Sequence, residues 1–440
     1  MRIRLLSFSI LLFAGILSVE GQVVFGLKEC INTGLERNFS ILISRNNESI
    51  SENNYTLGNA GYLPSVNLSS RFGGTLNNTA QNLTDGSRNE STGVHNTTTN
   101  AGASLGWTIF DGFNVQTTYK KLNELKQLGS LNTRLAVENL ITSIVAGYYN
   151  YIQQVQTLKN LEYAMTLSKE RLRIDQDRYL LGSSSKLQVL QSQVYLNADS
   201  SRLSNQFEVV RSSQVRLNEL MALEDLGTHF LSSDTIITVD PYLLYEKLFD
   251  QTLERNTNLN IARKNKIVSE YDYKIVTSRS YPYLNLSTGY NYNFNTYSTG
   301  TYNSQITNGL NYGLTLGMNI FDGFNQRRSI ANSDIEVQNR ELGYLEVEQG
   351  IKADLITIYY VYSNNLRLIQ LEEQNLTTAT ENLDIALERY KLGSLSGIDL
   401  REVQKSLLDA KERLLAIQYQ TKLAEISLKR ISGTIMEYYN

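Results

Sequence analysis

The sequence predicts a membrane protein of the α+β class, with four long helical columns and four β-strands in each protomer. Two long segments of the chain resemble each other at a nearly constant spacing, which indicates two copies of one structural unit. Each copy holds two stretches in which apolar and polar residues alternate, the pattern of a strand pair. Only three prolines occur in 440 residues, as long uninterrupted helices require.

The duplication is visible in short motifs. Two motifs of the first half return 211 residues later: Ile-Phe-Asp-Gly-Phe-Asn at 109–114 and 320–325, and Arg-Tyr-x-Leu-Gly-Ser at 178–183 and 389–394. Matches nearer the N-terminus are displaced by 218 residues, so a seven-residue difference lies between residues 68 and 105. We therefore expect two structural repeats, residues 23–240 and residues 241–440.

Residues 1–22 have the pattern of a secretory signal peptide, in which Arg2 and Arg4 precede an apolar stretch and small residues follow it. The apolar stretch is shorter than the roughly 20 residues that a membrane-spanning helix needs. Cys30 is the single cysteine, and export without an internal disulfide favours a bacterial envelope. The net charge of −3 and the lack of a basic tract give no reason to expect nucleic acid as a partner.

Each repeat is expected to open with a helix of about half the length of its main rod. We expect this half-helix at residues 25–60 in the first repeat and at residues 241–279 in the second. Asp240 and Pro241 would be the N-cap and the first residue of the second half-helix. A proline follows each half-helix and predicts the passage into a strand.

A β-hairpin follows in each repeat, at residues 62–110 and 281–321. Apolar residues alternate there with polar or small ones, as in Leu284, Asn285, Leu286 and Ser287. A soluble sheet with its apolar face on a core has this pattern, and so does a membrane barrel with its apolar face toward lipid. Strands of about ten residues, aromatic residues toward the loop ends and a polar second face favour the barrel. We expect residues 77–100 to form an exposed flexible loop that holds the seven-residue difference.

A long helix without proline follows each hairpin, at residues 112–179 and 323–390. About 67 residues of helix span roughly 100 Å at 1.5 Å per residue. Asp111 and Asp322, each followed by a glycine, would cap the start of the two rods. Apolar residues at three- and four-residue steps predict a coiled-coil seam along them.

The chain is then expected to turn, and a shorter helix returns at residues 185–222 and 396–433. Gly182 and Gly393 would end the outgoing helices. The returning helices begin with the spacing of a capping box, Ser185 with Gln188 and Ser396 with Asp399. Since each return covers little more than half of the outgoing rod, a half-helix completes the column.

Four strands cannot close a barrel, because eight is the smallest usual number. Hydrocarbon does not tolerate the open edges of a sheet, so copies of the chain must associate. A dimer would give eight strands and a filled interior, whereas a trimer would give twelve and room for an aqueous bore. The same number of copies must close a ring of helical rods, which favours the trimer.

The arrangement resembles the TolC family of outer-membrane efflux proteins over nearly the whole chain after the predicted signal. The two strand-to-helix turns at Asp111 and Asp322 and the two Arg-Tyr-x-Leu-Gly motifs carry the resemblance. It implies a homotrimer in the bacterial outer membrane, whose 12-stranded β-barrel continues into an α-helical tunnel across the periplasm. It also implies a passive exit duct of a tripartite efflux or type I secretion system. Such a duct docks on a periplasmic adaptor (membrane fusion) protein and an inner-membrane pump of the RND or ABC type.

The resemblance further implies a constricted entrance at the pole formed by the helical turns. Asp399 and Glu402, three residues apart on one helix face, match an acidic ring around the bore. The alternative is that Asp399 only caps its helix and Glu402 is solvated. Tyr390 matches a tyrosine that helps to hold the entrance shut, or it is a residue of the coiled-coil seam.

Two positions of the turns depart from the family pattern. Gln188 and Leu395 stand where an acidic and a basic residue are expected, so we expect a gate of neutral hydrogen bonds and packing. The same turns contain the remaining candidate gate residues, Tyr179, Gly182 and Gly393.

No catalytic, cofactor-binding or metal-binding pattern is apparent. The two histidines, His95 and His229, lie in expected loops far apart in the sequence, and neither a Gly-rich phosphate loop nor a Ser/His/Asp grouping occurs. We therefore expect no enzyme, no cofactor and no metal. An alternative function is that of a coiled-coil surface or adhesive protein anchored by a small barrel. That function does not explain why two half-helices match each rod.

Overall fold

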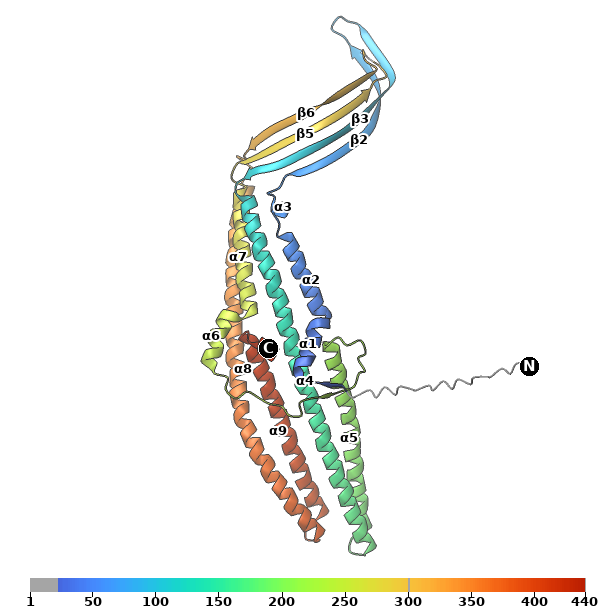
Figure 1. The fold of residues 1–440 in the computed structure, drawn as a ribbon, viewed down its shortest axis with the longest axis vertical. Coiled ribbons are helices and arrows are strands. Elements are labelled where there is room, and N and C mark those ends of the chain that lie inside the picture. Colours follow the sequence, from blue (N-terminus) through green and yellow to red (C-terminus); the bar gives the residue numbers. More distant parts are fainter. Residues whose placement is uncertain (1–22, 300, 440) are drawn as a thin grey trace, which may run out of the picture.

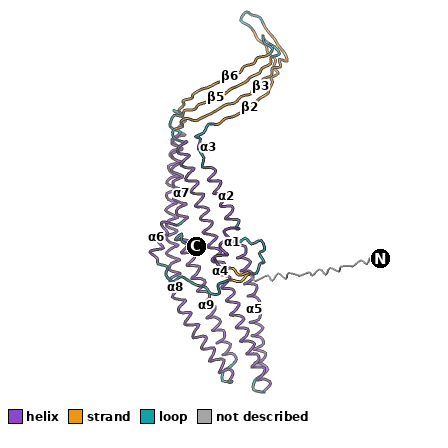
Figure 2. Tube along the Cα trace, in the orientation of Figure 1, coloured by secondary structure: helices purple, strands orange, loops and turns teal. Residues whose placement is uncertain are grey.

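The protein is long and narrow, with a β-sheet at one end and helical columns below it (Figure 1). The computed structural model describes residues 23–299 and 301–439, so the predicted signal peptide lies outside the described residues. Figure 2 shows that helices fill the column region and that strands are concentrated at the sheet end. In these ranges, none of the helices has a stretch long and apolar enough to cross a membrane. The predicted helix-rich α+β class with few strands is confirmed.

The sheet holds four antiparallel strands in the order β2-β3-β5-β6. They are β2 (Ser65–Asn82), β3 (Arg88–Asp111), β5 (Tyr283–Thr296) and β6 (Ser304–Gly317). Residues that face each other across antiparallel strands point to the same side of a sheet. One such row is apolar, Leu68, Ala103, Tyr290 and Leu310, and the next row, on the other side, is Ser69, Gly102, Asn291 and Gly309. The sheet therefore has one apolar and one polar side, and the apolar side is exposed in the protomer, with Leu68 at 87%.

The first hairpin contradicts the expected loop at residues 77–100. β2 continues to Asn82 and β3 begins at Arg88, with a register shift between Asn77 and Thr79. The strands are 18 and 24 residues long, and the hairpin projects beyond β5 and β6 in Figure 1. Threonine favours strands, and a polar strand that projects from the sheet lacks the alternation that marks a half-buried strand. The prediction was wrong for that reason.

The two expected half-helices are broken into shorter helices. The first consists of α1 (Leu27–Arg37), α2 (Phe39–Asn54) and α3 (Leu57–Ala60), and the second of α6 (Tyr245–Arg255) and α7 (Thr257–Ser278). An asparagine stands at the equivalent break in each repeat. Asn38 and Asn256 have ψ near 120°, and each side chain accepts a hydrogen bond from the following helix. Each amide also donates to the end of a returning helix, at Leu220 O and Ile431 O.

The second half-helix does not begin at Asp240 and Pro241 as predicted. α6 begins at Tyr245 after Leu244, whose side chain supplies no cap. The backbone N–H of Asp240 instead donates to Glu425 at 3.0 Å. A tertiary contact thus holds this dipeptide in the connecting segment before the helix.

The two rods are α4 (Asn114–Leu180) and α8 (Asn325–Lys391), each of 67 residues. Their N-cap positions are occupied by Phe113 and Phe324 in the left-handed conformation, and not by Asp111 and Asp322 as predicted. The side chains of the two aspartates nevertheless accept hydrogen bonds from backbone N–H groups in the first turn of each rod. Asp111 Oδ1 accepts from Val115 N at 3.2 Å, and Asp322 Oδ2 accepts from Gln326 N at 2.8 Å. The returning helices are α5 (Lys186–Leu220) and α9 (Gly397–Ile431).

A connecting segment and the C-terminal end cross the middle of the columns. The segment contains β4 (Phe230–Ser232), which pairs in parallel with β1 (Val23–Phe25), and the C-terminal end contains the 3-10 helix η1 (Ile435–Tyr438). Neither the strand pair nor η1 was expected from the sequence. Buried residues of α1, α4, α5 and α9 form the largest apolar core beside them.

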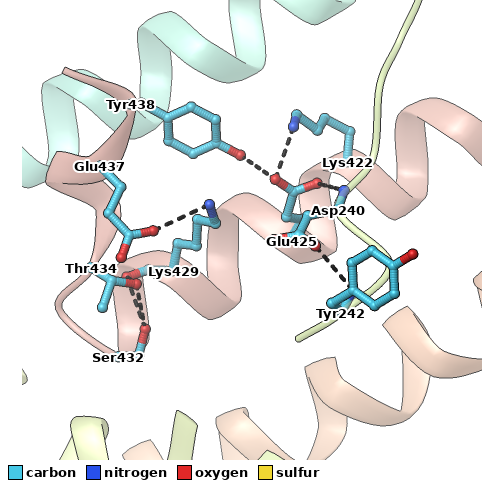
Figure 3. Close-up of polar contacts among 9 residues, drawn as sticks. All are labelled: Asp240, Tyr242, Lys422, Glu425, Lys429, Ser432, Thr434, Glu437 and Tyr438. Carbon is cyan, nitrogen blue, oxygen red and sulfur yellow. Dashed lines mark hydrogen bonds and ion pairs between the residues drawn. The ribbon is translucent and has the colours of Figure 1, made fainter. Parts of the chain in front are cut away.

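One buried carboxylate joins these crossing segments to α9. Glu425, 1% exposed, accepts hydrogen bonds from Lys422 Nζ at 2.9 Å, Tyr438 Oη at 2.6 Å and Asp240 N at 3.0 Å (Figure 3). Burial lowers the pKa of Lys422, although the Glu425 carboxylate opposes the shift. The Lys422 ammonium also lies 4.8 Å from the centre of the Tyr149 ring. We call this group, Asp240, Lys422, Glu425 and Tyr438, the Glu425 junction.

Replacing Glu425 by glutamine is expected to lower the stability of the columns. Glutamine retains an acceptor oxygen, but the buried Lys422 ammonium loses its counter-charge, which costs about 3–5 kcal/mol. Thermal unfolding followed by circular dichroism should show a lower Tm. The double variant K422M/E425Q removes the stranded charge and should regain most of the loss. An unchanged Tm for E425Q would contradict the role of the junction.

Candidate functional site

The candidate site is the tip of the columns, where α4 turns into α5 and α8 turns into α9. Gly182 and Gly393 have φ of +73° and +80°, a conformation that glycine adopts without strain. Gly182 N donates to Tyr179 O and Gly393 N donates to Tyr390 O, both at 3.0 Å. The two turns therefore have the same geometry, as the repeated motif requires.

The returning helices begin at the expected serines. Ser185 Oγ accepts from Gln188 N at 3.4 Å, and Ser396 Oγ accepts from Asp399 N at 3.1 Å. The Ser396 hydroxyl also donates to Asp399 Oδ2 at 2.7 Å. Asp399 and Glu402 are both exposed on the same end of α9. Capping therefore does not withdraw the Asp399 carboxylate from solvent.

Tyr390 connects the two rods at this tip. Its hydroxyl donates to Asp175 Oδ1 of α4, and Ser192 of α5 donates to Asp175 Oδ2. Tyr390 is 2% exposed and Asp175 is 1% exposed. Burial, together with the Asp175 carboxylate, raises the pKa of Tyr390 to about 12. The phenol therefore remains a neutral hydrogen-bond donor at physiological pH.

An ion pair between α5 and α9 reinforces this contact. Arg401 donates to Asp199 through two nitrogens, at 2.7 and 2.8 Å, and Ser168 of α4 donates to the same carboxylate. Burial alone would raise the pKa of Asp199, but the hydrogen bonds from Arg401 and Ser168 outweigh it, so the pKa lies below its usual value. Two-point pairing of this kind fixes orientation as well as distance.

Arginine side chains also lie over two tyrosine rings at the tip. The Tyr195 ring lies 4.9 Å from the Arg171 guanidinium and 5.0 Å from that of Arg401. Arg178 donates to the Tyr390 carbonyl and lies 4.8 Å from its ring. We call the whole set the tip latch: Arg171, Asp175, Arg178, Ser192, Tyr195, Asp199, Tyr390 and Arg401.

The contacts at the tip include charged groups, in addition to the neutral hydrogen bonds and packing that we expect for a gate. Gln188 and Leu395 stand where an acidic and a basic residue were expected. The charged groups at the tip come from other positions, among them Asp175 and Arg401. Gln188 contacts Ser184 and Ser185 of its own turn, and Tyr179 is 46% exposed, so neither joins the latch. Tyr390 is the one predicted gate residue that the structure places in the latch.

A signal for the missed residues was present in the sequence. Ala164, Ser168, Arg171 and Asp175 follow three- and four-residue steps along α4, and all four are buried. Polar side chains at seam positions of a rod indicate a buried partner on another helix. Within the described residues, no group of three or more His, Cys, Asp or Glu side chains is arranged to hold a metal ion.

Comparison with known proteins identifies the family. The model of the family described as "Outer membrane efflux protein" matches residues 30–223 and 248–434. The chain belongs to the outer membrane efflux protein family. The sequence resemblance is thereby confirmed. This family consists of channels and not of catalysts, and its members work with other pump proteins.

Individual relatives agree with this membership. Outer membrane protein TolC of Vibrio cholerae serotype O1 is 22% identical over 320 residues, which cover 68% of this chain and 69% of that protein. The crystal structure of CusC has a TM-score of 0.77 at 15% identity and covers 94% of this chain and 93% of that one. The Campylobacter jejuni CmeC outer membrane channel has a TM-score of 0.76 at 15% identity, with 99% and 94% covered. This outer membrane efflux protein is therefore an outer-membrane efflux duct that extends into the periplasm.

Loss of Arg401 is expected to loosen the tip. R401Q leaves the Asp199 carboxylate buried without a counter-charge, which costs about 3–5 kcal/mol. Hydrogen–deuterium exchange of the amides of residues 392–400 should accelerate at least about tenfold, since each 1.4 kcal/mol is tenfold. The matched control is R413Q, also on α9. The Arg413 side chain is 54% exposed, so its pair with Glu372 contributes at most about 1 kcal/mol. Equal exchange in R401Q and R413Q would show that the ion pair does not hold the tip.

Proposed function

We propose that three copies of this chain form a 12-stranded barrel in the outer membrane, which continues into an α-helical tunnel across the periplasm. The observation that carries the proposal is the sheet itself. Its outer strands β2 and β6 are unpaired along one edge, and one side is apolar and exposed. Backbone groups at an open edge are not satisfied in hydrocarbon, and four strands are too few to close. Pairing β6 of one copy with β2 of the next removes every edge.

The proposed duct is passive and serves a tripartite efflux or type I secretion system. Its partners are a periplasmic adaptor (membrane fusion) protein and an inner-membrane pump of the RND or ABC type. Membership of a family of efflux-pump outer membrane components supports partners of this kind.

The tip latch is proposed to hold the tunnel entrance closed at rest. It joins α8 and α9 to α4 and α5 through buried charges and hydrogen bonds, so opening separates these pairs. A partner opens the entrance only by binding the separated arrangement more tightly than the joined one. The partner's preference must therefore exceed the free energy of the latch.

Asp399 and Glu402 are proposed to line the entrance. In a trimer they place six carboxylates around the bore, and both side chains are exposed. The hydrogen bond from the Ser396 hydroxyl uses one carboxylate oxygen of Asp399, so the other oxygen is left for the bore. Tyr179, Gln188, Gly182 and Gly393 belong to the surrounding turns, where the glycines supply the required backbone conformation and the other two are exposed.

Channel recording tests the duct and its gate together. Purified protein in planar lipid bilayers should conduct weakly, and R401Q should raise the open probability because the latch is weakened. In the R401Q background, D399N/E402Q should shift the ion selectivity away from cations, since six carboxylates leave the bore. If R401Q with D399N/E402Q gives no conductance at all, the duct proposal fails.

Substitutions on the two sides of β6 test the barrel. Leu314 lies on the apolar side and is 64% exposed, whereas Asn311 lies on the polar side. L314R places an arginine toward the bilayer interior, which costs about 2–4 kcal/mol, whereas N311R faces water. The fraction of folded trimer extracted from outer membranes should fall for L314R and change little for N311R. Equal yields would indicate a sheet outside the membrane.

A further inference from the structure

We propose that Arg71 forms an anion-binding ring near the outer end of the bore, one arginine from each copy of the trimer proposed above, on which this inference rests. The ligands are solutes that carry carboxylate, phosphate or sulfonate groups. The ring would determine which charged solutes leave the duct easily and which ions enter it from outside.

The register of the sheet places Arg71 on the bore side. Arg71 faces Asn100, Asn100 faces Asn293, and Asn293 faces Thr307 across successive strand pairs. These four residues form one polar row across the sheet. In the neighbouring row, Phe72, Thr99, Phe294 and Ile306 point to the opposite, apolar side. The pairing is continuous from Ser65 to Asn77, so no bulge reverses the side chain of Arg71.

Arg71 is isolated in charge. Within residues 65–77, 94–108, 283–296 and 304–317, it is the single Asp, Glu, Lys or Arg. The polar side of these strands otherwise carries asparagine, serine, threonine, glutamine and glycine. The nearest charges along the first hairpin, Arg88 and Glu90, form an ion pair with each other. A lone charge in a neutral channel dominates the local potential.

The Arg71 guanidinium is not paired with another side chain of the described residues. Among the described residues it makes no hydrogen bond or ion pair, so its five N–H donors remain available for a ligand. It borders a hollow of about 260 Å³ lined by Gly73, Thr75, Asn96, Thr98 and Asn100. A planar guanidinium binds carboxylate and phosphate groups through two parallel hydrogen bonds.

The position along the barrel determines the effect. Asn293 of the same row lies three residues before Thr296, where β5 ends. This is the end of the sheet away from the helices (Figure 1). The ring therefore lies near the external mouth, at the opposite end from Asp399 and Glu402. A solute that passes the acidic entrance meets a basic exit, so the two ends select by opposite charge.

Bilayer recordings in the R401Q background, where the entrance is open, test the ring. The probes are a KCl gradient and inorganic triphosphate added on the loop side. R71Q should lower the anion-to-cation permeability ratio at least about threefold and weaken the triphosphate block about tenfold, because three positive charges are removed. R71K should retain the selectivity but bind triphosphate less tightly, since ammonium lacks the two-point geometry. The matched control is R88Q, which removes one positive charge per copy at the start of β3, outside the row of Arg71. Its permeability ratio and its triphosphate block should equal those of R401Q alone.

The outcomes separate this proposal from the duct itself. If R71Q changes neither the permeability ratio nor the triphosphate block, the ring proposal is overturned and the duct proposal stands. Equal effects of R71Q and R88Q also overturn it, because a surface charge would then account for the result. If the parent and all variants fail to conduct even after D399N/E402Q is added, the duct proposal fails, and the ring fails with it.

Discussion

An open sheet edge in hydrocarbon is the constraint on which the rest of the structure depends. The two outer strands can be satisfied only by other copies, and the helices that continue from each hairpin must then form a ring. The strand-to-helix turn transmits this arrangement. Gly112 has φ of +69°, and a side-chain carbon there would lie 2.3 Å from Ser278 O, so the turn packs directly against the end of α7. The end of β3, the end of α7 and the start of α4 therefore meet at this turn. The sheet thus determines where the columns begin.

The two repeats share their architecture and differ in the chemistry of the tip. Asn38 and Asn256 make equivalent bonds to the ends of α5 and α9. The latch has no such symmetry. Asp175 and Asp199 correspond, 211 residues later, to Ala386 and Ala410, which are buried apolar residues. Tyr390 and Tyr179 are the same residue type at equivalent positions, yet one is buried in the latch and the other is half exposed. The first repeat therefore has carboxylates where the second has alanines, and these carboxylates bind Tyr390 and Arg401 of the second repeat.

Sequence patterns predicted features whose cause is local. The alternation in β5 and β6, the two glycine turns and the serine caps each follow from neighbouring residues. Sequence patterns did not predict features that depend on residues far away in the chain. The projecting part of the first hairpin is mostly polar on both sides, so its strands lacked a visible period. Asp240 lies before the helix because Glu425, far along the chain, binds its amide. The latch joins residues more than 200 positions apart, such as Asp175 and Tyr390, and a polar seam residue does not name its partner.

Packing along the columns explains why the tip, and not the middle, is suited to opening. In the middle, Tyr148, Ile152 and Ile426 belong to one large buried core that joins α4 to α9, and the Glu425 junction fastens the crossing segments there. Separation at that level would expose much apolar surface. Toward the tip, a hollow of about 330 Å³ bordered by Asn160, Ile237 and Lys411 interrupts this packing. Beyond it, the apolar cluster around Leu383 and Leu400 receives only partly buried side chains from α4, Leu167 and Ile174. Directional polar contacts therefore dominate the union of the two rods at the tip. Once the rods separate, water or a partner's groups can satisfy such polar contacts again, whereas the apolar surface of a core stays exposed to water.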